Sequence, residues 1–287
     1  MWRKMKPREQ EQLAAEIRIL RDLQHKNIVR YISETVDHET KMVYIYMEYC
    51  GNGDLYELIQ SRKESSPVVR FSEHTVWQIF TQLAMALFRC HNGVDPPPLE
   101  DITNSATLGT AQIPQAKTGN IVLHRDIKPH NVFLDHNNRV KLGDFGLSKE
   151  LRGQNLAETF VGTPFYMSPE IIAGRAYNAK SDIWALGCVI YEMCAFDPPF
   201  LARDQHELNR KIKVGAVSSI VRYGYSEVLN STIQTCLRQD EKMRPSAAGL
   251  LRRPEMVMAR QQLHYFDREE LLLEKETRLV AHSEKRV

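Results

Sequence analysis

Apolar and polar positions follow two different rhythms along the chain, and the change between them separates a short strand-containing part from a longer helical part. Residues 7–24 repeat apolar side chains at helical spacing, whereas residues 28–36 and 42–49 are rich in β-branched and aromatic side chains. We therefore expect one helix followed by two strands. Glu16 falls on the apolar stripe of that helix, so its carboxylate needs a cation or strong hydrogen-bond donors.

Helical spacing dominates after residue 50. Residues 51–60 predict a turn and a short helix, and residues 72–92 predict a long amphipathic helix with Ser72 as its N-cap. Its expected apolar stripe consists of Val76, Ile79, Phe80, Leu83 and Leu87. A hairpin is expected around Asn137 and Asn138, and from residue 166 onward the pattern is mostly helical.

Two segments depart from this pattern. Residues 93–120 contain four prolines and no sustained periodicity, which predicts a long, mobile surface insertion. Residues 256–283 are charged and helix-prone. Two apolar sets in them repeat every seven positions: Tyr265, Leu272 and Leu279, and Phe266, Leu273 and Val280. A solvated terminal helix is the simpler interpretation, and a coiled coil that joins two copies is the alternative.

Composition narrows the class of protein. The 287 residues are 43% hydrophobic and 26% charged, with a net charge of +2, which gives no reason to expect a nucleic-acid partner. The five cysteines form no C-x-x-C pair and are expected to be reduced thiols. Neither an apolar leader nor a membrane span is expected from the pattern. We expect a cytosolic or nuclear protein with no membrane partner.

The strongest chemical signal is the stretch "VLHRDIKPHNVFL" at residues 122–134. It places Asp126, Lys128 and Asn131 within six positions, and Asp144 follows in "KLGDFGLS". A carboxylate in a fixed loop can orient a hydroxyl and accept its proton, and hard oxygen donors suit Mg²⁺. The order and spacing match the catalytic and metal loops of protein kinases.

Further stretches support that resemblance in the same order: "VGTPFYMSPE" (161–170), "SDIWALGCVIYE" (181–192) and "RPS" (244–246). Together with "YMEYCGNGDL" and "TFVGTPFYMSPE", they make the chain resemble the NIMA-related (Nek) serine/threonine kinases, in particular fungal members. The resemblance implies an α+β bilobal fold and the use of ATP and Mg²⁺. It divides the chain into a partial N-lobe (1–50), a C-lobe (51–255) and a charged helical extension (256–287).

The resemblance also assigns roles to the loop residues. It implies that Asp126 is the catalytic base and that Lys128 neutralises charge on the transferred phosphate. Asn131 and Asp144 are the implied Mg²⁺ ligands, and Thr163 resembles the threonine that braces the catalytic aspartate. Lys128 matches the serine/threonine pattern, and Leu147 resembles the residue type associated with a preference for serine.

A nucleotide pocket is implied at the end of the second strand. Met47 would gate the back of the adenine pocket, Glu48 and Cys50 would offer backbone groups to the adenine edge, and Phe133 would contribute to the floor. Glu16 resembles the helix glutamate that pairs with a strand lysine.

Other matches concern regulation and architecture. Thr159 is the candidate activating phosphosite, with Arg125 as the cation for its phosphate, although an ordinary loop threonine would look the same. Asp182 would hold the backbone of the His124 loop, and Glu170 would form a buried ion pair with Arg244. An apolar spine is implied for His124, Phe145, Leu20 and Tyr31, so packing is expected for His124 rather than base catalysis.

The sequence departs from the family at its beginning. It contains no G-x-G-x-x-G, and Lys4 lies too close to Glu16 for the usual strand lysine. We therefore expect that the chain begins after the first strands of the N-lobe and has little or no kinase activity as written. The alternative is a non-catalytic scaffold. The family implies protein substrates, a role in mitosis and a place at the spindle pole or centrosome.

Overall fold

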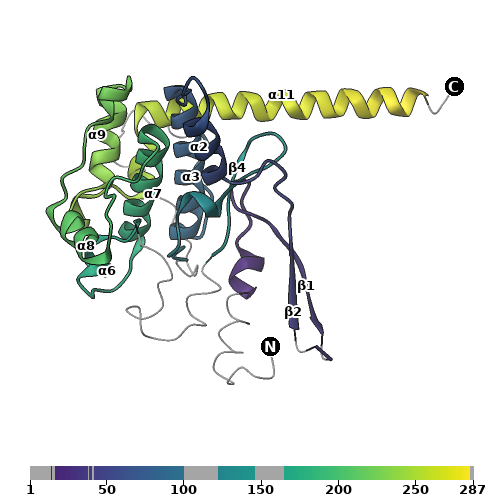
Figure 1. Cartoon of the computed structure of the whole chain (residues 1–287). Helices are drawn as coiled ribbons and strands as arrows, with labels where there is room; N and C mark the ends of the chain where they lie inside the picture. Colours follow the sequence, from purple (N-terminus) through teal and green to yellow (C-terminus); the bar gives the residue numbers. More distant parts are fainter. Residues whose placement is uncertain are drawn as a thin grey trace.

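The computed structural model describes residues 14, 17–37, 39–40, 42–99, 122–145 and 165–284. Within them, a helical body carries a β-hairpin on one side, and a long C-terminal helix runs across the body and projects beyond it (Figure 1). The described part of the chain has no helix that is both long and apolar enough to cross a membrane.

The projecting hairpin consists of β1 (Tyr31–Asp37) and β2 (Met42–Met47), which pair antiparallel. Side chains alternate between its two faces, as the period of a strand requires. Val43 and Ile45 pack toward the helical segment 17–22, whereas Tyr44 and Tyr46 face outward and are 43% and 50% exposed.

The first strand begins later than the sequence predicts, at Tyr31 rather than at residue 28. Ile28 forms a parallel bridge with Leu142, and the Val29 amide donates to the Leu142 carbonyl at 2.9 Å. This segment pairs elsewhere because Ile28 is buried in the main core, at 1% exposure. The β1–β2 hairpin is thereby fastened to the helical body at its base.

The expected hairpin around Asn137 and Asn138 is confirmed. It consists of β3 (Val132–Leu134) and β4 (Val140–Leu142), with Val132 opposite Leu142. The Asp135 carboxylate accepts the amides of Asn137 and Arg139 at 2.9 and 2.8 Å, and this closes the turn. All four strand ends are buried in the core.

The helical body contains eight described helices and three 3₁₀ turns. The helices are α2 (Leu55–Glu64), α3 (Glu73–Asn92), α6 (Pro169–Ile172), α7 (Ala179–Ala195), α8 (Gln205–Val214), α9 (Glu227–Cys236), α10 (Ala247–Leu251) and α11 (Pro254–Glu284). The 3₁₀ turns are η2 (Pro129–Asn131), η3 (Ile220–Tyr223) and η4 (Glu241–Met243). Ser72 caps α3 as predicted, since its hydroxyl accepts the Thr75 amide at 3.1 Å.

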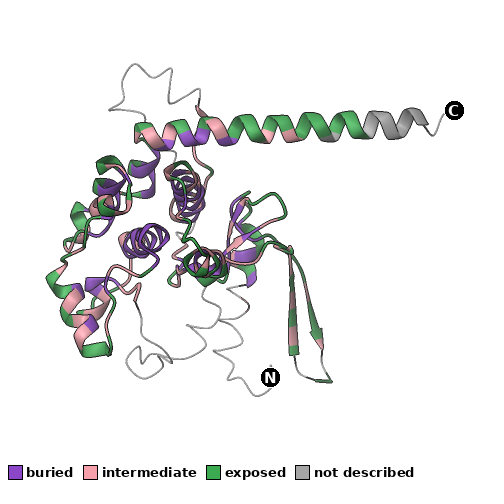
Figure 2. Ribbon diagram, turned by 45° about the horizontal axis from the view of Figure 1, so that its top comes forward, coloured by how far each residue is buried: buried purple, intermediate pink, exposed green. Residues whose placement is uncertain are grey.

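Two helices form the centre of the body, α3 and α7 (Figure 2). The predicted apolar stripe of α3 is buried throughout. In α7, every residue from Ser181 to Ala195 is buried, so this helix is enclosed on all sides. The five cysteines are free thiols, as expected.

The segment that follows α3 was expected to open a surface insertion, and its first residues contact the body. Gly93 ends α3 in the left-handed conformation, with φ of 70°. Arg260 donates to the Pro97 carbonyl at 2.7 Å. Residues 100–121, the remainder of that prediction, lie outside the described part.

Candidate active site

One buried carboxylate holds the backbone of the loop that begins at residue 122. Asp182, in the first turn of α7, is fully buried and accepts the amides of His124 and Arg125, each at 3.1 Å. His91 and Tyr177 also donate to it, at 2.8 and 2.5 Å. Burial alone would raise the pKa of Asp182, but these donors outweigh it and the pKa lies below its usual value.

This clamp supports an unusual backbone conformation. Arg125 has a φ of +66°, in the left-handed region that side chains other than glycine rarely adopt. Such a conformation persists where its surroundings hold it firmly in place. Here the backbone amides of His124 and Arg125 are held by their hydrogen bonds to the Asp182 carboxylate. The Asp126 side chain that follows is therefore aimed by a fixed backbone.

Three residues singled out from the sequence lie together in this loop. The Lys128 ammonium is 3.0 Å from Asp126 Oδ2. The Asn131 amide nitrogen donates to the Asp126 carbonyl at 2.8 Å and to Asp126 Oδ2 at 3.2 Å. Asp126 remains 19% exposed and Lys128 34% exposed, so both can be reached from solvent. This arrangement can hold a hydroxyl against a carboxylate next to a cation.

Asn131 and Asp144 sit at one end of the β3–β4 hairpin. Asn131 directly precedes β3, and the Gly143 amide donates to the Asn131 carbonyl at 3.0 Å. Asp144 follows Gly143 with a φ of +57° and is exposed, so a second left-handed residue borders the site. The hairpin thus brings these two residues to neighbouring backbone positions although they are thirteen residues apart in sequence.

The donor set at this end of the hairpin fits a hard divalent cation. Both hydrogen bonds that the Asn131 side chain makes to described residues are donated by its nitrogen, and Oδ1 is the oxygen it can offer to an ion. The Asp144 carboxylate supplies a second kind of hard oxygen. Among the described residues, no group of three or more His, Cys, Asp and Glu is placed to hold a metal. An ion here would therefore share its coordination with phosphate and water, as Mg²⁺ commonly does.

The four residues expected to form an apolar spine are in contact. The rings of His124 and Phe145 lie 4.5 Å apart, and Phe145 packs against the cluster that contains Leu20 and Tyr31. Burial lowers the pKa of His124, and its Nε2 lies 3.0 Å from the Gly143 carbonyl. His124 is therefore a neutral packing residue that also fixes the backbone next to Asp144.

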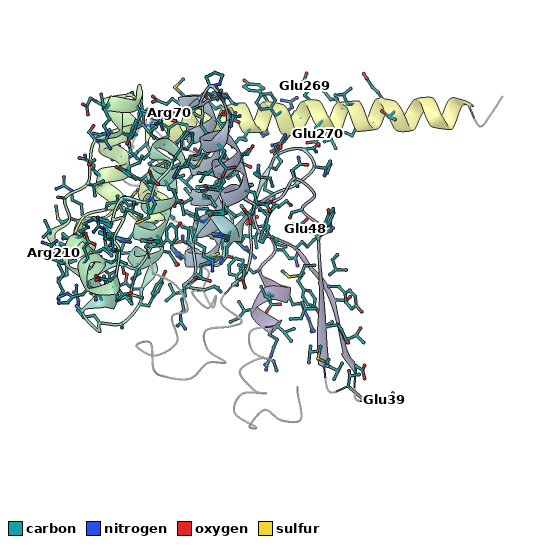
Figure 3. The ribbon with its side chains drawn as sticks, viewed as in Figure 1. Glu39, Glu48, Arg70, Arg210, Glu269 and Glu270 are labelled. Carbon is teal, nitrogen blue, oxygen red and sulfur yellow. The ribbon has the colours of Figure 1, made fainter. Side chains whose placement is uncertain are left out.

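The segment expected to contact adenine leaves β2 at Met47. The Glu48 amide donates to the Arg30 carbonyl at 2.9 Å. The backbone group that Glu48 can offer to a ligand is therefore its carbonyl. Figure 3 shows Glu48 where the β1–β2 hairpin joins the body, with Glu39 at the far tip. Cys50 is half-buried, and burial raises the pKa of its thiol.

Phe133, expected in the floor of the pocket, is half-buried on β3. A Cβ added at Gly143 would lie 2.9 Å from the Phe133 ring and 2.8 Å from Val29. Glycine is therefore required next to Asp144 because the ring and the N-terminal segment leave no space for a side chain.

The expected buried ion pair is present behind the site. Arg244 donates to both oxygens of Glu170, at 2.8 and 2.7 Å, and both side chains are fully buried. Ser181 donates to the same carboxylate at 2.6 Å. Burial would raise the pKa of Glu170, but the Arg244 hydrogen bonds lower it to about 2. The pair connects α6 to the segment before α10.

Sequence reasoning missed several contacts of the site. Lys141 pairs with the Glu48 side chain at 3.0 Å, and Tyr56 stacks on His130 at 4.0 Å between ring centres. Nothing in the spacing of these residues relates them, because each pair depends on how β3–β4 and η2 pack against other elements. Alternation in "VKL", which points Lys141 away from its buried neighbours, is the one usable signal.

Other expected site residues lie outside the described residues: Glu16, Thr159 and Thr163, together with Lys4 and Leu147.

Comparison with known proteins gives a consistent result. The model of the protein kinase domain matches residues 2–94 and 116–256. The G2-specific protein kinase nim-1 of Neurospora crassa is 47% identical over 260 residues, which are 90% of this chain and 30% of that protein. For the G2-specific protein kinase nimA of Emericella nidulans the identity is 44%, covering 91% of this chain and 37% of the relative.

The serine/threonine-protein kinase Nek2 of Homo sapiens is 42% identical over 247 residues, 86% of this chain and 50% of that protein. The chain therefore spans half or less of the length of these three relatives.

Proposed function

The chain belongs to the protein kinase family, among its NIMA-related members, and from this premise we propose that it carries the catalytic region of a kinase that phosphorylates serine and threonine in proteins. The observation that supports this most directly is the cluster of Asp126, Lys128 and Asn131 on a backbone held by Asp182. No step of the transfer requires more from the protein than orientation, one proton acceptor and charge stabilisation.

Each side chain has a distinct part in the proposed reaction. Asp126 orients the substrate hydroxyl and accepts its proton as the oxygen attacks the γ-phosphorus of ATP, while the bond from that phosphorus to the β-phosphate oxygen breaks and ADP leaves. Lys128, 3.0 Å from Asp126, neutralises charge that develops on the transferred phosphoryl group. Bound Mg²⁺ would neutralise the phosphates of ATP, and Asn131 and Asp144 would hold it. Thr163 is proposed to brace Asp126.

We propose that adenine lies against the Met47–Cys50 segment, with Phe133 beneath it. The Glu48 carbonyl and the Cys50 amide are the backbone groups offered to its edge, because the Glu48 amide is already bonded to Arg30. The Glu48–Lys141 ion pair ties this segment to β4. Glu16 is proposed to act with a strand lysine on the α- and β-phosphates.

Regulation and partners extend this proposal. Thr159 is the proposed activating phosphosite, paired with Arg125. The outward apolar residues of α11, which include Tyr265 and Leu272 at 69% and 57% exposure, are proposed to join two copies in a coiled coil. Because relatives are named as G2-specific kinases, we propose a role in the cell cycle. A place in the cytoplasm or nucleus and at the spindle pole is proposed from the family resemblance alone.

The 287 residues as written are proposed to transfer phosphate slowly or not at all. They contain no G-x-G-x-x-G whose backbone amides could cover the phosphates of ATP. The competing proposal is a scaffold that binds partners without catalysis. The intact set of Asp126, Lys128, Asn131 and Asp144 favours the enzyme, because a scaffold has no need for that combination.

Radiometric phosphate transfer to a serine/threonine peptide tests both proposals. Three proteins are compared: the 287-residue chain, the same chain preceded by a glycine-rich loop and a strand lysine from a relative, and that fusion with Asp126→Asn. We expect turnover from the fusion alone, with a loss of about 100-fold or more on the substitution.

Full kinase turnover by the 287-residue chain would contradict its proposed inactivity. A folded fusion that binds Mg·ATP but transfers no phosphate would favour the scaffold.

A further inference from the structure

The helix α11 contacts the body in two different ways along its length. Its first turns pack on α3 through buried side chains, among them Met256, Ala259 and Leu263, at 0%, 3% and 4% exposure. Beyond Leu263 the apolar side chains of the helix emerge into solvent, and Phe266 and Leu273 are 49% and 59% exposed. Figure 2 shows the same change along the helix from buried to exposed.

A groove of about 760 Å³ opens where the packing ends. It lies between α11, α3 and the turn of the β3–β4 hairpin, and its lining includes Phe266, Leu273, Gln78, His136 and Asn138. Apolar contact therefore does not hold the middle of α11 against the hairpin.

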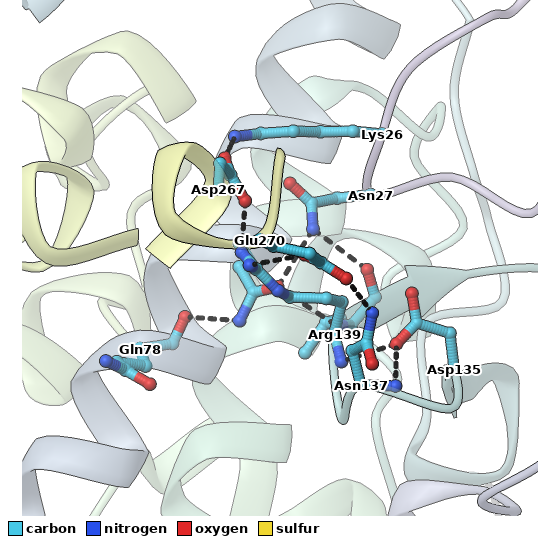
Figure 4. Close-up of polar contacts among 10 residues, drawn as sticks. Lys26, Asn27, Gln78, Asp135, Asn137, Arg139, Asp267 and Glu270 are labelled. Atoms are coloured by element: carbon cyan, nitrogen blue, oxygen red, sulfur yellow. Dashed lines mark hydrogen bonds and ion pairs between the residues drawn. The ribbon is translucent and has the colours of Figure 1, made fainter. Parts of the chain in front are cut away.

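Beside this groove, charged side chains connect α11 to the hairpin turn and to Lys26 (Figure 4). Asp267 bonds to Lys26 at 2.8 Å through one carboxylate oxygen and to Arg139 through the other. Glu270 binds Arg139 at 3.3 Å and also accepts a hydrogen bond from the Asn137 side chain. Arg139 binds both carboxylates and is the least exposed of these side chains, at 19%. A network of ion pairs, rather than a single pair, therefore fixes the helix here.

The partners of α11 belong to elements that position the candidate site. Arg139 and Asn137 lie in the turn at one end of the β3–β4 hairpin, and Asn131 and Asp144 lie at the other end. The turn is rigid, because Asp135 accepts two of its amides. With three residues per strand, about 10 Å of paired backbone separates the two ends.

Lys26 connects the same carboxylate to the base of the N-terminal part. Its neighbour Asn27 is buried, donates to the Val140 carbonyl at 2.9 Å and to Gln82 at 3.0 Å, and accepts the Leu142 amide at 2.9 Å. Gln82 of α3 also accepts the Val140 amide at 3.0 Å. Asp267 thus reaches both sides of the junction between segment 26–29 and β4.

We propose that Asp267 is a positioning residue, through which the docked α11 fixes the β3–β4 hairpin and with it Asn131 and Asp144. The assignment of a role to these two residues rests on the proposed function, whereas the mechanical link does not. Docking of α11 and order at the far end of the hairpin are thereby coupled, so a factor that releases the helix loosens the ion-binding end.

The coupling is reversible by nature. The four bridging side chains are 19% to 54% exposed, so salt screens their interactions, while the buried contacts of Met256 and Leu263 are insensitive to it. The middle of α11 can therefore detach while its first turns stay in place. A partner or a modification that acts on residues 264–273 would therefore change the order of the backbone at Asn131 and Asp144 without contacting either residue.

Amide hydrogen exchange of the 287-residue chain, without nucleotide, tests the proposal. The variant is Asp267→Asn, and the matched control is Glu276→Gln, an equal change of charge on an exposed position of the same helix. In Asp267→Asn the amides of Val140, Leu142 and Gly143 are expected to exchange about 3- to 10-fold faster. Glu276→Gln should leave them unchanged, and Asp267→Glu should restore most of the protection.

The pattern of exchange separates positioning from general destabilisation. Equal acceleration in α9 and α10 would overturn the proposal, since the substitution would then act on global stability. Unchanged hairpin exchange in Asp267→Asn would overturn it as well. Raising the salt concentration should accelerate the same hairpin amides in the wild type and have a smaller effect in the variant, which keeps only the Glu270–Arg139 pair. Because no turnover is measured, failure of the kinase proposal would leave this result interpretable.

Discussion

The helical body and the β1–β2 hairpin differ in how much of their apolar surface they bury. Every residue of α7 from Ser181 to Ala195 is buried, whereas Ile32 and Tyr46 in the hairpin are 57% and 50% exposed. The candidate loop residues are fixed by α7 through Asp182, while the expected adenine-contacting segment leaves the end of β2. One half of the candidate site therefore stands on a rigid base, and the other half on a sparsely covered sheet.

Charged pairs differ between the two regions in the same way. Glu170 and Arg244 are fully buried and bidentate in the helical body. Glu34 of β1 pairs with Arg21 at 26% and 53% exposure. Removing one partner of a buried pair leaves an uncompensated charge, whereas an exposed pair is replaced by water.

Glu170→Gln should produce the largest effect, because it leaves Arg244 without its buried counter-charge. We expect a loss of about 3–5 kcal/mol in the free energy of unfolding, measured in urea at neutral pH. Glu34→Gln is the matched control in the hairpin, with an expected loss of about 0.2–1 kcal/mol. Equal losses in the two variants would show that burial does not distinguish the regions.

Leu186→Ala tests the apolar side of the comparison. Leu186 is fully buried in α7, so the cavity should cost about 2–5 kcal/mol. Ile45→Ala, at a half-buried position of β2, should cost clearly less, because the hairpin can relax around it. Chemical denaturation of both variants measures the difference. A larger loss for Ile45→Ala would reverse our ranking of the two regions.

Glu192→Gln probes a buried carboxyl of α7 through its pH dependence. Burial raises the pKa of Glu192 to about 7, and Tyr166 donates to it at 2.6 Å. Its contribution to stability is present below the unfolded pKa near 4.5 and is lost as pH rises toward about 7.

Relative to the wild type, the glutamine variant should therefore gain up to about 3 kcal/mol between pH 4.5 and pH 8. A constant difference between Glu192→Gln and wild type across this range would refute the raised pKa.

Tyr44→Thr should have the smallest effect. Tyr44 lies on the outward face of β2, and threonine suits a strand, so unfolding free energy should change by no more than about 0.5 kcal/mol. Light scattering should show less self-association, because an exposed aromatic side chain is removed. A loss above about 1 kcal/mol would indicate that this face is covered in solution.

Sequence patterns predicted the elements that depend on local periodicity and turn chemistry. The helix after Ser72 and the hairpin at Asn137 follow from spacing and from residues suited to caps and turns. The predicted start of β1 was wrong because an apolar, β-branched residue such as Ile28 fits a strand in either sheet. Only packing of the folded chain decides that its partner is Leu142.

The candidate site shows the same division. Asp126, Lys128 and Asn131 are close in sequence, and their contacts follow from a single loop. Lys141 and Asp267 act across 93 and 241 residues of chain, on Glu48 and Lys26, and no local pattern encodes those distances. Long-range ion pairs among half-exposed residues leave little trace in composition or periodicity.

The carboxylate of Asp182 also has a consequence for the chain length beside the candidate loop. His91 at the end of α3 and the amides of His124 and Arg125 all meet this one group, and the Val122 amide donates to the Cys90 carbonyl at 2.9 Å. The end of α3 and the chain that begins at Val122 are thus held at one fixed point. Lengthening such a loop costs only about 0.6 kcal/mol per doubling. Insertions or deletions between Asn92 and Val122 are therefore expected to leave Asp126 in place.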